Sequence, residues 1–159
     1  MNLAPSQAGY GAREMVMRHP LSLVSGVVVG VDGSDAAAAA VQWAAAEACR
    51  RQILLRIVSA WQEHDQPAPP LSGDPARIAA TQVQKALTRV LARQHYPRRI
   101  ACATPRGAPG EALLSEVGEH GLLVLGVAGV STTPWPGSVN RHCLRRGRGP
   151  LVFVAALPA

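Results

Sequence analysis

Cysteine, aromatic and acidic residues are all scarce in this chain of 159 residues. The three cysteines are an odd number without Cys-x2-Cys spacing, which argues against a disulfide scaffold. Neither they nor the five histidines show the spacing of metal ligands. No run approaches the ~20 apolar residues of a membrane helix, and the first residues lack the apolar core of a signal peptide. We therefore expect a cytoplasmic protein with reduced thiols, no metal and no membrane span.

Acidic residues number only ten, and no Ser/His/Asp or Cys/His set emerges. The sequence therefore predicts no catalytic residues and no enzyme. The formal net charge is +6, and Lys85 is the single lysine, so the excess is almost all arginine. Four arginines gather near the end of the last predicted helix, where the helix dipole favours cations. Because no aromatic residues are interleaved with them, we expect no nucleic-acid partner; these arginines are Arg141, Arg145, Arg146 and Arg148.

Apolar runs alternate with helical patterns from residue 24 onward. Strands are predicted at 26–31, 53–60, 98–104, 122–125 and 151–155, and helices at 35–51, from 75 to before Pro97, at 109–117 and at 138–146. Such alternation predicts an α/β, Rossmann-like fold, an open five-stranded parallel sheet with helices on both faces. Residues 1–23 show no periodicity and are predicted to be a flexible leader. Residues 24–159 are predicted to form a single domain.

The candidate ligand-binding residues follow the ends of two predicted strands. Asp32 follows the first apolar run, and Gly126 follows the fourth. Glycine lets backbone approach a ligand, and the N-terminus of the following helix offers unpaired N–H groups. In open α/β sheets, ligands bind beyond the carboxyl ends of the strands, where the strand order reverses. If these strands are neighbours, they form an anion-binding crevice, although Asp32 also suits a simple turn and Ser138 an N-cap.

The order and spacing of several short segments resemble the universal stress protein family over residues 25–157. The segments are Val-Gly-Val-Asp-Gly-Ser at 29–34, Ile-Val-Ser-Ala-Trp at 57–61, Gly-Ala-Pro at 107–109, Gly-Ser-Val at 137–139 and Pro-Leu-Val-Phe-Val at 150–154. The resemblance implies the strand order 3-2-1-4-5, which makes the first and fourth strands neighbours. It also implies ATP or another adenine nucleotide as ligand, and a homodimer through the last strand.

The resemblance assigns roles to individual positions in the crevice. Asp32 would meet the ribose or the phosphates, and backbone near Ala60 would meet adenine. The phosphates would lie against the family pattern Gly-x2-Gly-x9-Gly-[Ser/Thr], matched here by Gly126, Gly129, Gly137 and Ser138.

The interval between Gly129 and Gly137 departs from this family pattern. It holds seven residues, and among them Pro134 and Pro136 have no N–H to donate. We therefore expect weak or absent triphosphate binding, while a nucleoside or a monophosphate still fits.

Three functions remain open from the sequence. The leading one is a stress-response module that binds an adenine nucleotide. The alternative is a structural or interaction dimer of the same fold that binds none, and the third is an ATP-pyrophosphatase-type enzyme, whose second glycine after the first strand is missing here. The dimer is expected because an apolar last strand at a sheet edge invites pairing with a second copy; its residues are Leu151, Val152, Phe153 and Val154.

Overall fold

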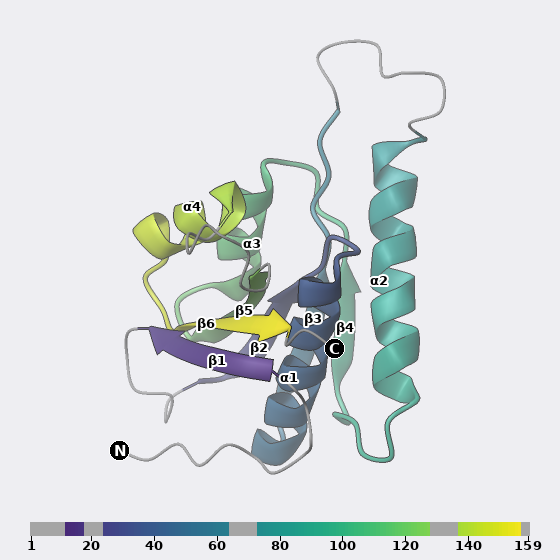
Figure 1. Cartoon of the computed structure of the whole chain (residues 1–159), viewed down its shortest axis with the longest axis vertical. Helices are drawn as coiled ribbons and strands as arrows, with labels where there is room; N and C mark the ends of the chain where they lie inside the picture. The colour runs from purple at the N-terminus through teal and green to yellow at the C-terminus, as the bar shows by residue number, and fades with distance from the viewer. Residues whose placement is uncertain (1–11, 18–23, 64–72, 128–136, 157–159) are drawn as a thin grey trace.

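Residues 12–17, 24–63, 73–127 and 137–156 are described by a computed structural model of the chain. Strands and helices alternate along most of it (Figure 1). The elements in chain order are β1 Ala12–Met17, β2 Gly26–Gly30, α1 Asp35–Arg51, β3 Leu54–Val58, α2 Pro75–Leu91, β4 Ile100–Ala103, α3 Pro109–Val117, β5 Gly121–Val127, α4 Ser138–Arg146 and β6 Leu151–Ala156.

The central strands are apolar along their whole length because helices cover both of their faces. Val27, Val29 and Val124 are fully buried. The first helix begins where the sequence predicts, since the Ser34 hydroxyl accepts a hydrogen bond from the Ala37 N–H at 3.1 Å. It ends at Gln52, which adopts a left-handed conformation with φ 57°.

The sheet has the order β1-β6-β5-β2-β3-β4. The five strands from β6 to β4 in this order are parallel. Because β2 is the first strand of the prediction, β4-β3-β2-β5-β6 is the predicted order 3-2-1-4-5, which is confirmed. In the ladder between β2 and β5, Val29 stands opposite Val124, which brings the carboxyl ends of these two strands side by side. The predicted neighbours are therefore neighbours in the fold.

One strand differs from the sequence prediction. Ala12–Met17 forms β1, which pairs antiparallel with β6 from Ala12 opposite Ala156 to Met17 opposite Leu151. The expectation of a flexible leader does not hold for these six residues, and β6 is not an edge strand. An exposed apolar edge needs a partner for its main-chain groups, and here a segment from the start of the same chain supplies it.

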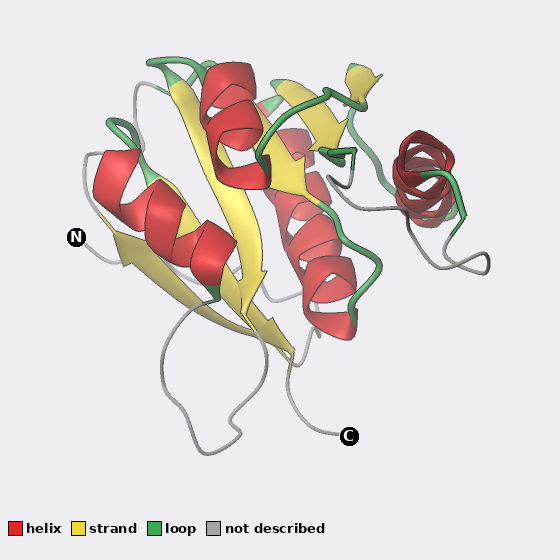
Figure 2. Cartoon of the chain, turned by 90° about the horizontal axis from the view of Figure 1, so that it is seen from above, coloured by secondary structure: helices red, strands yellow, loops and turns green. Residues whose placement is uncertain are grey.

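Helices lie on both faces of the sheet (Figure 2), and two hydrophobic clusters pack between them and the strands. One packs α1 on β2, β5 and β6 and α2 on β3 and β4, with residues such as Ala40, Ala44 and Val83. The other packs α3 on β2 and β5, with α4 beside α3, and includes Leu113 and Cys143. Among the described residues, none of the helices combines the length and the apolarity that a bilayer crossing requires.

Candidate functional site

A crevice opens beyond the carboxyl ends of β2, β3 and β5, with a volume of about 170 Å³. The chain leaves β2 toward β3 on one side, while β5 lies on the other, so this is the point at which the strand order reverses. The crevice wall includes Asp32, Ala60 and Gly126, which the sequence predicts for the site. The structure therefore brings these three together from three different strand ends.

Asp32 organises the turn that follows β2. Its Oδ1 accepts a hydrogen bond from the Ser34 N–H at 2.9 Å, and Gly33 between them has φ +84°, a conformation that favours glycine. Ser34 then caps α1. The exposed Asp32 carboxylate is thus fixed at the crevice wall by its own turn, as its interpretation as a turn residue predicts.

Gln82 is the residue of this site that sequence reasoning missed. Its Oε1 accepts from the Ser59 hydroxyl at 2.8 Å, and its Nε2 donates to the Asp32 carbonyl at 3.0 Å. One amide from α2 therefore ties together the segments that follow β2 and β3. The available signal was a glutamine next to Val83, in the apolar stripe of α2, where a polar side chain needs an internal partner.

Position 126 requires glycine because the backbone of α1 packs directly against it. A Cβ at this position would lie 2.4 Å from the Ala36 carbonyl carbon and 2.6 Å from the Ala37 nitrogen. A larger residue here would therefore press on the backbone of α1 and disturb the fold. On its other side, the Gly126 carbonyl accepts from the buried Asn140 Nδ2 at 2.9 Å, which attaches α4 to β5.

The start of α4 differs from the prediction in one detail. Gly137 is its N-cap, without a side-chain hydrogen bond, and Ser138 is the first helical residue, so the predicted Ser138 cap is wrong. Gly137 and Ser138 are exposed, while the next two residues, Val139 and Asn140, line the crevice. Gly129, with the segment that contains Pro134 and Pro136, lies outside the described residues.

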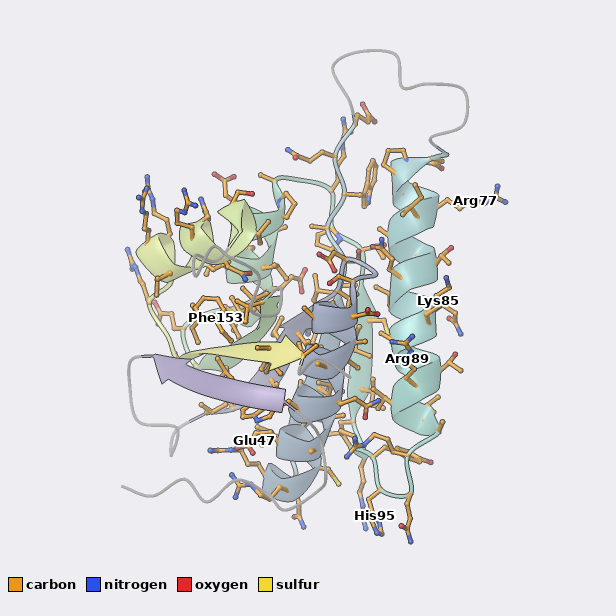
Figure 3. The ribbon with its side chains drawn as sticks, viewed as in Figure 1. Glu47, Arg77, Lys85, Arg89, His95 and Phe153 are labelled. Atoms are coloured by element: carbon orange, nitrogen blue, oxygen red, sulfur yellow. The ribbon has the colours of Figure 1, made fainter. Side chains whose placement is uncertain are left out.

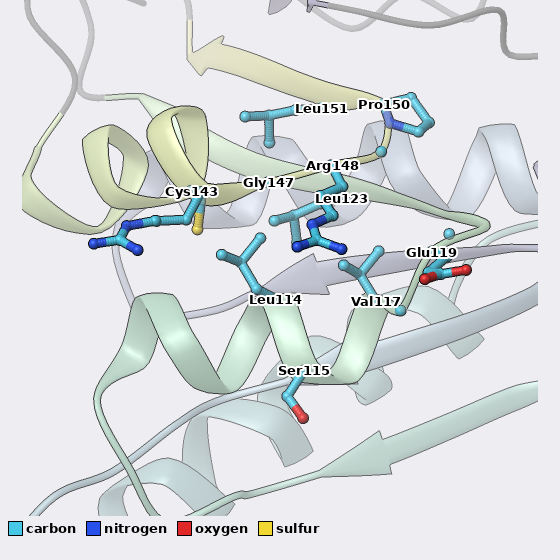
Figure 4. Close-up of a pocket in the computed structure, with 14 residues that line it drawn as sticks. Leu114, Ser115, Val117, Glu119, Leu123, Cys143, Gly147, Arg148, Pro150 and Leu151 are labelled. Atoms are coloured by element: carbon cyan, nitrogen blue, oxygen red, sulfur yellow. The ribbon is translucent and has the colours of Figure 1, made fainter.

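A second cavity, of about 380 Å³, lies at the opposite end of β5 and β6, between α3 and α4 (Figure 4). Its walls include the apolar side chains of Leu114, Val117 and Leu123. Cys143 also lines it, and burial raises the pKa of this thiol to about 11, so it stays protonated. This end of the strands is not where α/β sheets bind ligands, which leaves the crevice as the candidate site.

Side chains that could bind a metal ion do not cluster in the described part of the chain. No group of three or more His, Cys, Asp or Glu side chains there is placed to hold a metal ion. The crevice offers one carboxylate, two hydroxyl and two amide side chains, from Asp32, Ser34, Ser59, Gln82 and Asn140. Such a set suits hydrogen bonding to a neutral or weakly charged polar ligand.

Comparisons with known proteins agree with this fold. A universal stress protein family structure from Burkholderia pseudomallei superposes with a TM-score of 0.61 at 23% identity, over 88% of this chain and 100% of that one. A universal stress protein in complex with cAMP gives 0.60 at 23% identity, over 83% and 97%. An Arabidopsis thaliana family member with AMP bound gives 0.59 at 14% identity, over 84% and 92%.

Among curated proteins, no match was found. The universal stress protein family model matches residues 25–155, which is most of the chain and covers the parallel strands except for the last residue of β6. The chain therefore belongs to the universal stress protein family.

Proposed function

We propose that this chain is a stress-response binding module that takes an adenine mononucleotide, such as AMP or cyclic AMP, in the crevice. The observation that carries the proposal is the convergence of Asp32, Ala60 and Gly126 at the switch point of the sheet. Distant relatives of the same fold were solved with cAMP and with AMP. Their ligands share the base, the ribose and a single phosphate.

The size of the crevice favours a compact ligand. Its volume of about 170 Å³ is below the roughly 300–1,000 Å³ of typical small-molecule sites. A base and part of a ribose suit that space better than an entire triphosphate does. The two prolines between Gly129 and Gly137 also remove backbone donors that a triphosphate would use. We therefore propose that AMP and cyclic AMP bind more tightly than ATP.

Calorimetry with AMP, cyclic AMP, ADP, ATP and adenosine tests this proposal. The informative variant is Asp32→Asn, because asparagine preserves the hydrogen bond to the Ser34 N–H and removes only the charge. If the carboxylate accepts from the ribose hydroxyls, AMP affinity falls about tenfold, the loss expected for a charged hydrogen bond. Asp35→Asn is the matched control, since Asp35 is an exposed acid in the first turn of α1 and does not line the crevice.

Equal effects of the two substitutions would remove Asp32 from the site. Absence of binding by all five compounds at millimolar concentration would contradict the proposal and favour the interaction protein with an empty crevice. Tighter binding of ATP than of AMP would contradict the preference for a monophosphate.

The homodimer through Leu151–Val154 stays a prediction, and β1 makes it conditional. β6 already pairs with β5 on one side and β1 on the other, so a second copy can add to β6 only where β1 has left. We propose that the dimer forms through β6 once β1 has left it, so a variant that lacks residues 1–23 should dimerise or aggregate more readily than the full chain, as measured by light scattering. A full chain that dimerises while β1 stays paired with β6 would show that the dimer uses another surface.

A further inference from the structure

The positive charge of this protein is concentrated in one continuous segment. Residues 75–110 contain seven of the sixteen Lys and Arg residues and none of the ten Asp and Glu residues. The rest of the chain is therefore close to neutral. This segment comprises α2, β4 and the connections around them, and β4 is the last strand of the sheet at the end opposite β1. The net charge of +6 thus arises from the segment that forms α2 and β4, at one end of the sheet.

The exposed face of α2 carries part of this charge in a row. Arg77, Lys85 and Arg89 are all exposed and follow one another along the helix (Figure 3). From the first to the last they span about 18 Å, at 1.5 Å per residue. The positions between them on this face are neutral, among them Thr81 and Thr88, whose hydroxyls donate to carbonyls of the preceding turn. We refer to Arg77, Lys85 and Arg89 as the basic row.

Two further arginines extend the basic row beyond the end of α2. Arg98 and Arg99 are exposed and lead into β4. In the part of the chain that the structure describes, none of the salt bridges involves them or a member of the basic row. These charges therefore face solvent, which is the arrangement that attracts a polyanion.

A cavity with an aromatic wall lies beyond the C-terminal end of α2, and Arg98 and Arg99 contribute to its lining. Its volume is about 640 Å³, and its lining includes Gln52, Gln94, His95 and Tyr96 as well as the two arginines. Tyr96 is 47% exposed, although large apolar and aromatic side chains are usually covered. An aromatic ring beside arginines, with amides that donate and accept, is what an unstacked nucleobase needs.

The expectation of no nucleic-acid partner was drawn from the arginines of α4 and did not consider this surface. We propose that the basic row, Arg98, Arg99 and the Tyr96 cavity form a binding surface for single-stranded nucleic acid. The phosphates would follow the basic row, and one base would stack on Tyr96. A single strand fits better than a duplex because a duplex keeps its base faces stacked and out of reach of Tyr96. The arginines of α4 lie beside α3, which carries the acidic residues Glu111 and Glu116.

An acidic protein partner fits this surface less well. Protein interfaces have an apolar centre with a polar rim. The large apolar side chains exposed on α2 are Ile78 and Leu91, thirteen residues apart near its two ends, and they do not form a patch. The surface therefore offers charge and one stacking ring, which is the combination that binds nucleic-acid strands.

Fluorescence anisotropy with a labelled single-stranded RNA or DNA of about 12 nucleotides tests the proposal, since the basic row spans about 18 Å. We expect dissociation constants of about 10⁻⁴–10⁻⁶ M near physiological salt and a log–log salt slope near −3.5 for five phosphate contacts. Replacing all three residues of the basic row with Gln should reduce the steepness of that slope by about 2. Tyr96→Ala should weaken binding about 5- to 100-fold, and Tyr96→Phe should preserve it.

The control is a triple variant with equal loss of charge, Arg141→Gln with Arg145→Gln and Arg146→Gln on α4. It should bind almost as the unchanged chain does, because charges more than about 8 Å away are screened at physiological salt. Equal losses in the two triple variants would overturn the proposal and leave only nonspecific attraction by net charge. Tighter binding of a duplex of the same length, or of poly-glutamate, would also overturn it. None of these residues lines the crevice, so its nucleotide binding can fail or succeed independently.

Discussion

The two faces of the sheet are packed in different ways. On the α1 face, small side chains such as Ala36 and Ala40 let the helix backbone approach the strands, so that a Cβ added at Gly126 would lie 2.4 Å from the main chain of Ala36. On the α3 face, a Cβ added at Gly30 would lie 2.9–3.1 Å from the side-chain ends of Leu125 and Leu113. Main chain cannot move aside as a leucine methyl can. The α1 face therefore fixes positions, while the α3 face can adjust.

The sharpest test of this difference is a matched pair of glycine substitutions. Gly126→Ala should destabilise the fold by about 3 kcal/mol or more, because a methyl group would displace the first turn of α1. Gly30→Ala should cost about 1 kcal/mol, because two leucine side chains can shift to other rotamers. Urea denaturation measures both. Similar costs would contradict the contrast between the two faces.

The α3 face also carries a titratable group in its core, whereas the cluster on the α1 face consists of aliphatic residues. Burial raises the pKa of Cys143 from 9.0 to about 11. The thiol therefore stays protonated in the folded chain and ionises on unfolding once the pH exceeds about 9. The free energy of unfolding should be unaffected by this group below about pH 9 and should fall by on the order of 2–3 kcal/mol as the pH rises toward 11.

Denaturation curves of the unchanged chain and of Cys143→Ala, recorded in reducing buffer across this pH range, isolate the effect. Other groups titrate equally in both proteins, so the difference between the curves reports Cys143. A difference that stays constant with pH would show that the thiol is not held in its neutral form by burial.

The smallest contrast concerns the helix starts on the two faces. Ser34→Ala removes the hydroxyl that accepts from the Ala37 N–H and should cost about 1 kcal/mol. Ser138→Ala should change stability by less than about 0.5 kcal/mol, because Gly137 is the cap and the serine makes no capping bond. Thermal denaturation of both variants decides this, and an equal cost would mean that Ser138 has a stabilising contact of its own.

The strands and helices of the core could be predicted because their patterns are local. Continuous apolar runs indicate strands buried on both faces, and the spacing of Ala37, Ala40 and Val41 indicates one face of a helix. The crevice could be predicted as far as the ends of two strands. These features depend on neighbours within a few residues in the sequence, so the sequence alone reveals them.

The remaining features depend on contacts between distant segments. The role of Gln82 requires that Ser59 and Asp32 come to the same side of α2. The need for glycine at 126 arises from α1, some ninety residues earlier in the chain. The strand Ala12–Met17 exists because the edge of β6 is open to it. A local sequence pattern cannot reveal these three contacts, because each joins segments that are far apart in the chain.

The pairing of β1 with β6 joins the first strand of the chain to the last. During synthesis from the N-terminus, β1 is made first and waits for its partner until almost the whole chain has left the ribosome. Each of the parallel pairs also joins segments separated by a helix, so most sheet contacts close long loops. This edge of the sheet can therefore be completed only after β6 has been synthesised.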